Sequence, residues 1–334
     1  MATIYDVARR AEVSPATVSR VVNGHANVDP TLADRVRRAM RELEYRPNAV
    51  ARNLRRSRTT LWAVIISDIG NPFFTALVRG VEDVAQGAGY SVLLCNSDDD
   101  PAKERQYVDA VLAEQIAGVI MSPAGPGPHV NRLVEARVPV VQIDRQLADV
   151  AADAVLVDNA HGAEQATAHL IESGYRRIGC ITGPPPVFTA GERLLGYRRA
   201  LAAHGLPFDE ELVRHADFRE SGGYRAMAGL LGLRCRPDAV FAANNMTTIG
   251  AMECLVDSGV SVPDEMGVVG FDDVPWAHLV RPSLTTVAQP TYELGRTAAE
   301  LLAQRIGAPD REPSTVTLNT KLQIRDSSIR PRYP

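Results

Sequence analysis

The sequence predicts a small all-α domain at the N-terminus, followed by an α/β core built from two doubly wound parallel sheets. Residues 1–46 hold three short segments in which apolar side chains recur at helical spacing behind residues that favour helix starts. From Leu61 onward, apolar runs of four or five residues alternate with amphipathic stretches, which is typical of parallel sheets covered on both faces. The 334 residues also exceed what one ordinary hydrophobic core contains, so we expect several compact units.

The composition is that of an ordinary globular α/β protein. Hydrophobic residues make up 45%, charged residues 23% and aromatic residues 5% of the chain. No apolar stretch reaches the roughly 18 residues of a membrane span and no signal-peptide pattern opens the sequence, so we expect a cytoplasmic protein without a membrane partner. The four cysteines form no C-x-x-C pair and the seven histidines are dispersed, so we expect neither a metal site nor a cofactor.

Charge is distributed unevenly along the chain. Residues 1–60 carry twelve arginines and six acidic residues, a net charge of +6, whereas the remaining residues carry 24 basic and 34 acidic residues, a net charge of −10. A basic segment on an acidic body indicates a polyanionic partner at the N-terminus, because the body itself would be repelled by nucleic acid. A solvated helical face would show the same excess of arginine, so charge alone leaves both interpretations open.

The first helix is expected to begin after Thr3 and to end near Ala11. Thr3 and Asp6 have the spacing of a capping box, in which each residue satisfies a backbone amide of the other. The apolar residues that follow at helical spacing are Ile4, Val7, Ala8 and Ala11. This spacing predicts one short amphipathic helix.

Two further helices follow at short intervals. Ser14 is a good N-cap and Pro15 suits the first position of a helix, so the second helix is expected over Pro15–Asn23. Asp29 and Pro30 open the third helix in the same way. Its expected buried stripe is Leu32, Val36, Ala39, Met40 and Leu43.

The order helix, tight turn, helix is that of a helix-turn-helix, whose second helix enters the DNA major groove. On this helix Arg20 can donate two hydrogen bonds to a guanine, and Ala16 can contact a thymine methyl group. Thr17, Ser19 and Asn23 can reach phosphates or bases. A purely structural three-helix bundle is the alternative, but an exposed face of small residues with one arginine contributes little to packing. We therefore favour DNA binding.

The runs TIYDVARRAEVSPATVSRVVNG and YRPNAVARNLR resemble the headpiece of the lac-repressor (LacI/GalR) family, and the resemblance extends over nearly the whole chain. It implies a homodimer on a pseudo-palindromic operator. Glu12 departs from the family, which often has glycine in this turn, and a non-glycine residue at positive φ is mildly costly. The DNA contacts expected from the motif and the resemblance are Thr3, Ser14, Pro15, Ala16, Thr17, Ser19, Arg20, Asn23, Asn27, Leu54 and Arg55.

The headpiece is expected to span residues 1–46, and residues 47–60 are expected to form a hinge helix and linker. Pro47 precedes about nine residues with three arginines, and an isolated helix of this length is marginal in water. The resemblance implies that the hinge helix forms on DNA and inserts Leu54 into the minor groove at the operator centre. Because such a wedge unstacks a base step, we expect a deformable central step. A polar linker with one stray leucine is the alternative.

Seven apolar runs in the core, which is expected to span residues 61–334, predict strands. They cover residues 62–66, 91–94, 118–121, 139–143, 177–181, 239–242 and 267–270. Ligands of such sheets bind beyond the carboxyl ends of the strands, where this chain has acids, amides and arginines, among them Asp68, beside Phe73 and Phe74. Carboxylates and guanidinium groups bond sugar hydroxyls, and aromatic faces pack on the ring. Each residue alone fits a helix cap equally well, so the sugar pocket is inferred from the set.

The core resembles the ribose-type periplasmic binding proteins. This implies a first lobe of about 61–160 and 291–321 and a second of about 161–290 and 322–334. The ligand contacts that the resemblance implies are Asn71, Phe73, Phe74, Asp144, Arg145, Arg193, Phe218, Asn244, Asp272 and Gln289. The match at these positions favours a pentose such as ribose, although family members for other sugars share most of them. The purine-responsive branch has an arginine where this chain has Val187, so a purine is less favoured.

Together these features predict a repressor of a sugar-utilisation operon that leaves its operator when the sugar binds. The sequence has no G-x-S-x-G, Walker or H-E-x-x-H motif, so we do not expect an enzyme. Two alternatives stay open: a catabolite-control regulator driven by a phosphoprotein partner and, more remotely, a sugar-modifying enzyme. Induction is favoured over corepression for a sugar sensor.

Overall fold

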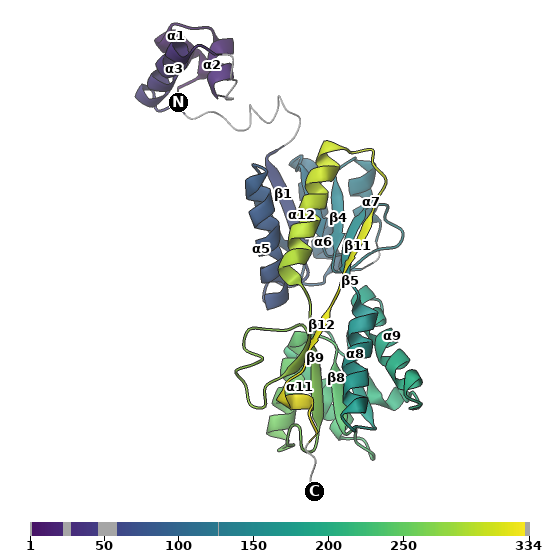
Figure 1. Ribbon diagram of the computed structural model, residues 1–334. Coiled ribbons are helices and arrows are strands. Elements are labelled where there is room, and N and C mark those ends of the chain that lie inside the picture. Colours follow the sequence, from purple (N-terminus) through teal and green to yellow (C-terminus); the bar gives the residue numbers. More distant parts are fainter. Residues whose placement is uncertain (1, 23–27, 46–58, 126, 331–334) are drawn as a thin grey trace. The chain divides into compact units, whose positions relative to one another are not determined.

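The computed structural model describes residues 2–22, 28–45, 59–125 and 127–330, which form two compact units, residues 1–59 and 60–334 (Figure 1). The predicted hinge, with Leu54 and Arg55, lies outside the described residues, as do Asn23 and Asn27. Among the helices of the described ranges, none is both long and apolar enough to cross a membrane.

The N-terminal unit, here called the headpiece, contains three helices. They are α1 (Ile4–Ala11), α2 (Pro15–Val22) and α3 (Pro30–Glu42). The predicted capping box is present, because the Asp6 amide donates to the Thr3 hydroxyl oxygen at 3.3 Å and the Thr3 amide donates to the Asp6 carboxylate at 2.9 Å. Asp29 caps α3 through its carboxylate, as expected. Glu12 ends α1 with a φ of 51°, the left-handed conformation for which the family often uses glycine.

Small apolar residues from all three helices form the headpiece core. They are Val7, Ala8, Ala11, Val18, Val36 and Ala39. Of the stripe predicted for α3, Val36 and Ala39 are buried, and the half-buried Met40 and Leu43 pack against the core. Leu32 is half-buried and was wrongly included, whereas the buried Ala33 was missed. Ala33, Val36 and Ala39 follow one another at three-residue spacing and so share one face of the helix.

The first lobe of the core contains a fully parallel sheet in the order β11–β5–β4–β3–β1–β2. Its strands are β1 (Leu61–Ile66), β2 (Ser91–Asn96), β3 (Gly118–Met121), β4 (Val140–Ile143), β5 (Asp153–Val157) and β11 (Thr315–Leu318). Its helices are α5 (Pro72–Gly87), α6 (Pro101–Ala113), α7 (Pro128–Glu135) and α12 (Thr291–Gly307). Helices α5 and α12 cover one face of the sheet, and α6 and α7 cover the other.

The second lobe repeats this connectivity, with the strand order β12–β10–β9–β8–β6–β7. Its strands are β6 (Ile178–Thr182), β7 (Val213–His215), β8 (Ala239–Ala242), β9 (Gly267–Phe271), β10 (Thr285–Ala288) and β12 (Lys321–Gln323). Its α-helices are α8 (Asn159–Glu172), α9 (Phe188–Ala203), α10 (Glu220–Leu231) and α11 (Asn245–Asp257), and short 3-10 turns cover Glu210–Leu212 and Asp326–Ser328. A wholly parallel sheet was predicted, but the edge strand β12 runs antiparallel to β10.

The chain passes between the lobes three times, after β5, after β10 and after β11 (Figure 1). As a result, α12 and β11 complete the first lobe and β12 completes the second. The lobes are therefore joined by several short connections, an arrangement that permits a change of angle between them.

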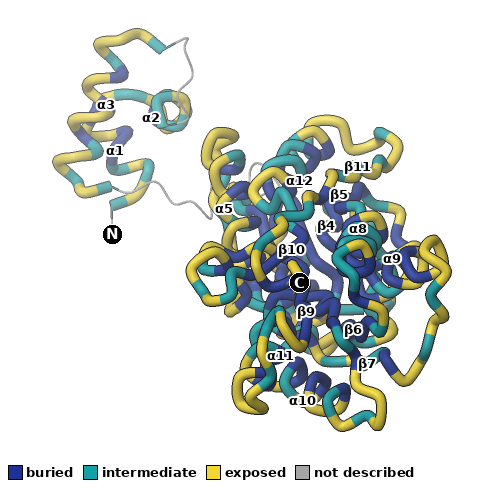
Figure 2. The backbone as a smooth tube through the Cα atoms, turned by 60° about the horizontal axis from the view of Figure 1, so that its bottom comes forward, coloured by how far each residue is buried: buried dark blue, intermediate teal, exposed yellow. Residues whose placement is uncertain are grey.

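Both faces of each sheet are buried, which explains the continuous apolar strands. Along β1, Trp62, Val64 and Ile66 pack with α5 and α12, whereas Ala63 and Ile65 pack with α6 and α7. Figure 2 shows this buried interior in dark blue within the exposed outer layer of the core. The alternation follows from the two-residue period of a strand. Every residue of the central strands β3, β4, β6, β8 and β9 is buried, whereas the edge strand β2 exposes Leu93 and Leu94.

The seven predicted strands are present as β1, β2, β3, β4, β6, β8 and β9. Five strands were not predicted: β5, β7, β10, β11 and β12. Strands β7 and β12 have three residues each, and β11 (TVTL) and β10 (TTVA) are rich in threonine. Strands β7, β11 and β12 lie at sheet edges, where one side of the strand meets no neighbour and a continuous apolar run is not required.

Candidate ligand cavity and DNA-contacting helix

Helix α2 presents most of the described residues that were predicted to contact DNA. The Ser14 hydroxyl oxygen accepts a hydrogen bond from the Thr17 amide at 3.1 Å, so Ser14 caps the helix as expected. Pro15, Ala16 and Arg20 are exposed, and Thr17 and Ser19 are half-buried. The Arg20 side chain is therefore accessible to a base edge.

A cavity in the core is lined by residues of both lobes at the carboxyl ends of the strands. In each sheet this is the point where the first strand lies between the second and third, the usual ligand position in doubly wound sheets. We call it the sugar-type cavity. All ten residues predicted to contact ligand line it: Asn71, Phe73, Phe74, Asp144, Arg145, Arg193, Phe218, Asn244, Asp272 and Gln289.

In the first lobe, Asp144 and Arg145 follow β4 and are both buried. The Arg145 guanidinium group forms an ion pair with Asp99, and its Nε lies 3.6 Å from Asp144 Oδ2. Burial raises the pKa of Asp144, and the positive charges of Arg145 and Arg193 partly oppose this rise. The pair thus offers buried acceptors and donors close together.

In the second lobe, Arg193 projects from α9 and is held on three sides. Its Nε donates to Asn159 Oδ1 at 2.8 Å and its Nη1 donates to the Ala243 carbonyl at 2.7 Å. Its guanidinium carbon lies 3.8 Å from the centroid of the Phe271 ring. Burial lowers the pKa of Arg193, and the negative charges of Asp272 and Asp144 partly oppose this decrease. These contacts fix the orientation of a planar donor at the cavity.

Asp272 follows β9, and its carboxylate is oriented by two side-chain amides. Gln289 Nε2 donates to Oδ1, and Asn244 Nδ2 lies 3.5 Å from Oδ2. Asn244 is itself fixed as the cap of α11, because its Oδ1 accepts from the Met246 amide at 2.9 Å. The second lobe therefore holds its acceptor as firmly as its donor.

Three phenylalanine rings give the cavity apolar surfaces. The rings of Phe73 and Phe74 meet edge to face, with centroids 5.0 Å apart. The ring of Phe218 occupies the space beside Gly183, where an added Cβ atom would lie 2.1 Å from the Phe218 Cζ. Glycine at 183 is required for this close approach.

Four residues of the cavity have a left-handed backbone. The φ values are 58° for Asp99, 65° for Asp144, 58° for Phe218 and 71° for Asp272, and these are four of the nine non-glycine residues with positive φ in the described part of the chain. The conformation is tolerated by aspartate but uncommon for a bulky residue such as phenylalanine. Backbone conformations of this kind cluster at functional sites.

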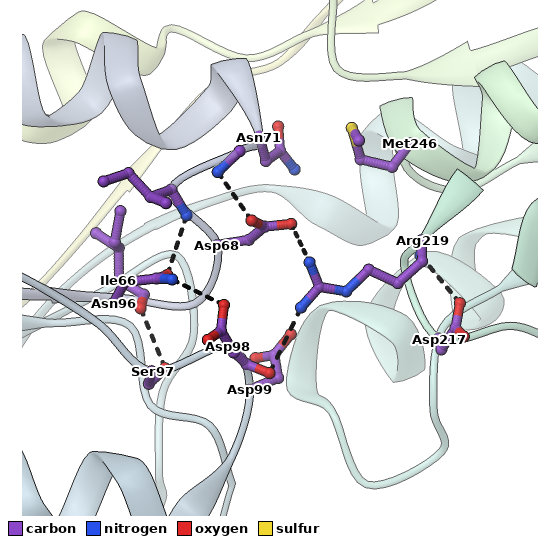
Figure 3. Close-up of polar contacts among 12 residues, drawn as sticks. Ile66, Asp68, Asn71, Asn96, Ser97, Asp98, Asp99, Asp217, Arg219 and Met246 are labelled. Atoms are coloured by element: carbon purple, nitrogen blue, oxygen red, sulfur yellow. Dashed lines mark hydrogen bonds and ion pairs between the residues drawn. The ribbon is translucent and has the colours of Figure 1, made fainter. Parts of the chain in front are cut away.

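Two polar contacts connect the lobes beside the cavity. Arg219 Nη1 donates to Asp68 Oδ2 at 2.5 Å, and its Nη2 lies 3.5 Å from the Asp98 carbonyl oxygen, as Figure 3 shows. Asn71 and Asn245 exchange two amide hydrogen bonds of 3.1 and 2.8 Å. Any change in the angle between the lobes must alter these contacts.

Charge and hydrogen bonding at the cavity fit a neutral polar ligand. Four carboxylates and three guanidinium groups line it, so the charges nearly balance. Seven buried side-chain polar atoms in the described ranges have no hydrogen-bond partner, and two of them belong to residues of the cavity. These are Arg145 Nε, a donor that lies 3.6 Å from Asp144 Oδ2, and Gln289 Oε1, an acceptor. Buried polar atoms are rarely left unpaired in native proteins, so a ligand with both donors and acceptors fits here.

Comparison with known proteins identifies the family. Residues 3–48 match the bacterial regulatory proteins of the lacI family, and residues 167–328 match a periplasmic binding protein-like domain. Catabolite control protein A of Priestia megaterium is 37% identical over 98% of this chain and 99% of its own length. A ribose operon repressor of Halalkalibacterium halodurans is 36% identical over 98% of this chain and 97% of its own length. The chain belongs to the LacI family.

Solved structures of LacI-family proteins have the same fold. A complex described as the transcriptional regulator CelR with cellobiose matches with a TM-score of 0.76 and 36% identity, over 98% of this chain and 100% of that one. A lac repressor dimer bound to operator and an anti-inducer matches with a TM-score of 0.86 and 27% identity, over 98% of this chain and 99% of that one. The predicted headpiece and the predicted two-lobed core are confirmed, and the chain is a DNA-binding transcriptional regulator.

Five residues of the cavity were not among the predicted ligand contacts of this LacI-family chain. They are Ser67, Asp68, Asp99, Thr189 and Arg219. Asp68 had been noted as an acid at a strand end, and Asp99 lies just beyond the end of β2, so the rule that located Asp144 would have included both. The only sequence signal that could have pointed to Arg219 is its position next to Phe218. Its role as a contact between lobes depends on the distance between two separate loops.

Proposed function

We propose that this LacI-family regulator represses a sugar-utilisation operon and leaves its operator when a neutral sugar binds in the sugar-type cavity. The composition of the cavity carries the proposal: buried carboxylates and guanidinium groups in near balance beside three phenylalanine rings. Such groups bond vicinal hydroxyls, and the rings pack on the C–H face of a sugar. A sugar hydroxyl both donates and accepts, so it suits Arg145 Nε and Gln289 Oε1.

The headpiece supports sequence-specific binding to a pseudo-palindromic operator by a homodimer. Arg20 and Ala16 are the direct base readers, and the predicted hinge supplies Leu54 as the wedge at a deformable central step. Two headpieces are needed to read two half-sites. Exposed apolar side chains on the core, Leu93 and Leu94 of β2 and Val256 of α11, support self-association of the cores.

Sugar binding is coupled to DNA binding through the angle between the lobes. The Asp68–Arg219 and Asn71–Asn245 contacts lie at the cavity, so a bound ligand changes the balance between lobe arrangements. A shift of the first lobes of the dimer changes the spacing of the hinges, and the hinge helices form only at a suitable spacing. A coupling free energy of about 1–3 kcal/mol changes operator affinity roughly 5- to 150-fold.

The matching positions favour a pentose ring, such as that of ribose, in the sugar-type cavity. Two relatives at 36% identity are a ribose operon repressor and the regulator CelR in complex with cellobiose. They support a saccharide as the ligand, but they do not distinguish a monosaccharide from a disaccharide. Control by a phosphoprotein alone is less favoured, because that mechanism makes no use of the buried cavity. The named relatives are regulators, which supports a protein that senses its ligand without transforming it.

Titration calorimetry tests the proposal. Ribose, other pentoses and hexoses are titrated into the full-length protein, alone and with an operator duplex selected from random DNA. We expect one sugar to bind and to lower operator affinity at least about fivefold. A sugar that raised operator affinity would identify a corepressor. If no sugar bound to a protein that still bound operator, the sugar-sensing function would be wrong.

A further inference from the structure

A second groove adjoins the sugar-type cavity. This outer groove is lined by residues 123–125, 145–149 and 186–188. Its three segments follow β3, β4 and β6, so it opens at the same carboxyl edges of the sheets as the cavity. Arg145 lines both spaces, and the consecutive residues Phe188 and Thr189 line one each. The two spaces therefore share a wall.

The lining of the outer groove differs from that of the cavity. Phe188, Val187 and Leu147 provide half-buried apolar surface at the start of α9 and in the loop after β4. Gln146 and Asp149 add an amide and a carboxylate in the same loop. An aromatic ring beside a few polar groups suits the amphipathic faces of a sugar ring. This mixture is less polar than the lining of the sugar-type cavity, which holds four carboxylates and three guanidinium groups.

Buried hydrogen bonds fix the walls of the outer groove. Glu104 Oε2 accepts from the Ala124 amide at 2.8 Å, and Glu104 Oε1 lies 2.6 Å from His129 Nε2, with both side chains buried. Gln142 Oε1 accepts from the Leu147 amide at 2.7 Å. Because the loops are already ordered, little conformational entropy is lost when a ligand binds. The outer groove is thus prepared for an occupant.

The charges of the outer groove argue against an anionic occupant. Among the described residues that line it, Arg145 is the only cation, and it is paired with Asp99 and Asp144. Asp149 adds a negative charge that would repel a phosphate or carboxylate. A neutral group that stacks on Phe188 and forms hydrogen bonds with the loop after β4 needs no unpaired cation and is not repelled by Asp149.

We propose that the outer groove is a second sugar subsite, so that the effector is a disaccharide or a longer glycoside. Its first ring fills the sugar-type cavity, and its second ring extends past Arg145 and packs on Phe188. The proposal rests on the sugar-sensing function and adds the length of the ligand to it.

The test compares sugars that differ by one ring. Glucose and cellobiose, and xylose and xylobiose, are titrated into the full-length protein by calorimetry. We expect the disaccharide of at least one pair to bind about tenfold more tightly than its monosaccharide, since a second ring adds an aromatic contact and hydrogen bonds. Phe188→Ala and Phe188→Leu should each weaken disaccharide binding roughly five- to tenfold and leave monosaccharide binding within about twofold.

Phe208→Ala is the matched control. Phe208 packs against Tyr197 and Arg198 and lines neither space, so this variant should bind every sugar as the wild type does. Operator binding verifies that each variant is folded, and Phe188→Leu carries the test if Phe188→Ala does not fold.

Two results are distinguished. Equal affinity within each pair, or unchanged disaccharide affinity in the Phe188 variants, would refute the second subsite and leave the sugar-sensing function in place. Failure of every sugar to bind would overturn the sugar-sensing function, and the second subsite with it.

Discussion

Arg193 and Asp272 are the side chains on which the proposed sugar response depends most directly. Both are buried in the second lobe and held by neighbouring amides and carbonyls. Removing either leaves buried partners unpaired, which costs about 1–3 kcal/mol or more, a loss of roughly tenfold or more in sugar affinity. We predict that Arg193→Ala and Asp272→Ala bind operator normally but are not released by sugar, as measured by gel shift with and without sugar.

Arg198→Ala is the matched control for this prediction. Arg198 lies on the same helix, α9, but its guanidinium carbon packs 4.3 Å from the centroid of the Phe208 ring. Arg198 lines neither the sugar-type cavity nor the outer groove. This variant should respond to sugar as the wild type does. A wild-type response in both Arg193→Ala and Asp272→Ala would show that the sugar binds elsewhere.

Arg20 is the corresponding side chain for DNA recognition. It is exposed on α2, and a bidentate contact with guanine discriminates by about 1–3 kcal/mol per half-site. We predict that Arg20→Ala loses most of the difference in affinity between operator and random duplex, measured by gel shift in competition, with unchanged sugar binding. Arg37→Ala, on α3 and paired with Asp34, should keep that difference. Equal selectivity in both variants would contradict the role of Arg20.

The ten residues that gather at the cavity were predicted from residue types near strand ends together with the resemblance to the ribose-type periplasmic binding proteins. The pairing of Asp68 with Arg219, and of Asn71 with Asn245, could not be predicted in this way. Each pair joins two loops from different lobes, and the angle between lobes is set by many packing contacts at once. Local sequence spacing contains no information about that angle.

Among the elements, α5 and α12 cross so closely that their contact requires glycine. A Cβ atom added at Gly295 would lie 1.9 Å from the Leu77 carbonyl oxygen, and one added at Gly80 would lie 2.2 Å from the Tyr292 carbonyl oxygen. Neither helix can move away without disturbing the first-lobe core between them and the sheet.

This contact predicts a difference between two glycines of α12. Gly295→Ala should lower the free energy of unfolding by about 1–3 kcal/mol, because the added methyl group forces the helices apart. Gly307→Ala, at the other end of the same helix with no atom within 4 Å of its added Cβ, should leave stability unchanged or slightly raised. Denaturant unfolding of both variants measures the difference, and equal stabilities would disprove the close crossing.

The prediction of elements succeeded for most apolar, well punctuated segments, but it missed β5, a buried central strand with an apolar run. Capping residues such as Thr3 and Asp29 marked helix starts, and central strands were continuous apolar runs. Short edge strands such as β7 and β12 were missed because pairing with a neighbour, and not their own composition, makes them strands. The limits drawn for the headpiece, hinge and lobes stay a prediction.

For the whole molecule, charge separates the two activities. The basic headpiece can approach DNA, while the acidic core remains in solution and disfavours indiscriminate contact with the same polyanion. The sugar-type cavity lies in the core, so its occupancy can change operator affinity only by altering how the cores present the headpieces. In the mechanism proposed above, the operator-bound and sugar-bound arrangements of the dimer differ in the contacts between lobes.

The stability of the whole core should depend on pH through Asp153, which joins β5 to α12 and β11. Its buried carboxylate accepts hydrogen bonds from Arg305 Nε at 2.9 Å and from the Ser314 amide at 2.9 Å. Burial alone would raise the pKa of Asp153, but the bonds from Arg305 and Ser314 outweigh it and hold the pKa below the usual 3.8. A lowered pKa means that the folded state binds this proton less readily than the unfolded state does.

It follows that the stabilisation from Asp153 is fully present above about pH 4 and is lost as pH falls through the lowered pKa of the folded state. We predict that Asp153→Asn lowers the free energy of unfolding at pH 7 by about 3–5 kcal/mol, because Arg305 is left without its charged partner. The difference from wild type should shrink below about pH 4, as urea unfolding between pH 7 and pH 3 would measure. Asp310→Asn, on the exposed loop after α12, is the control and should match wild type throughout. A difference between Asp153→Asn and wild type that stayed constant over this range would mean that the carboxylate acts through packing and not through its charge.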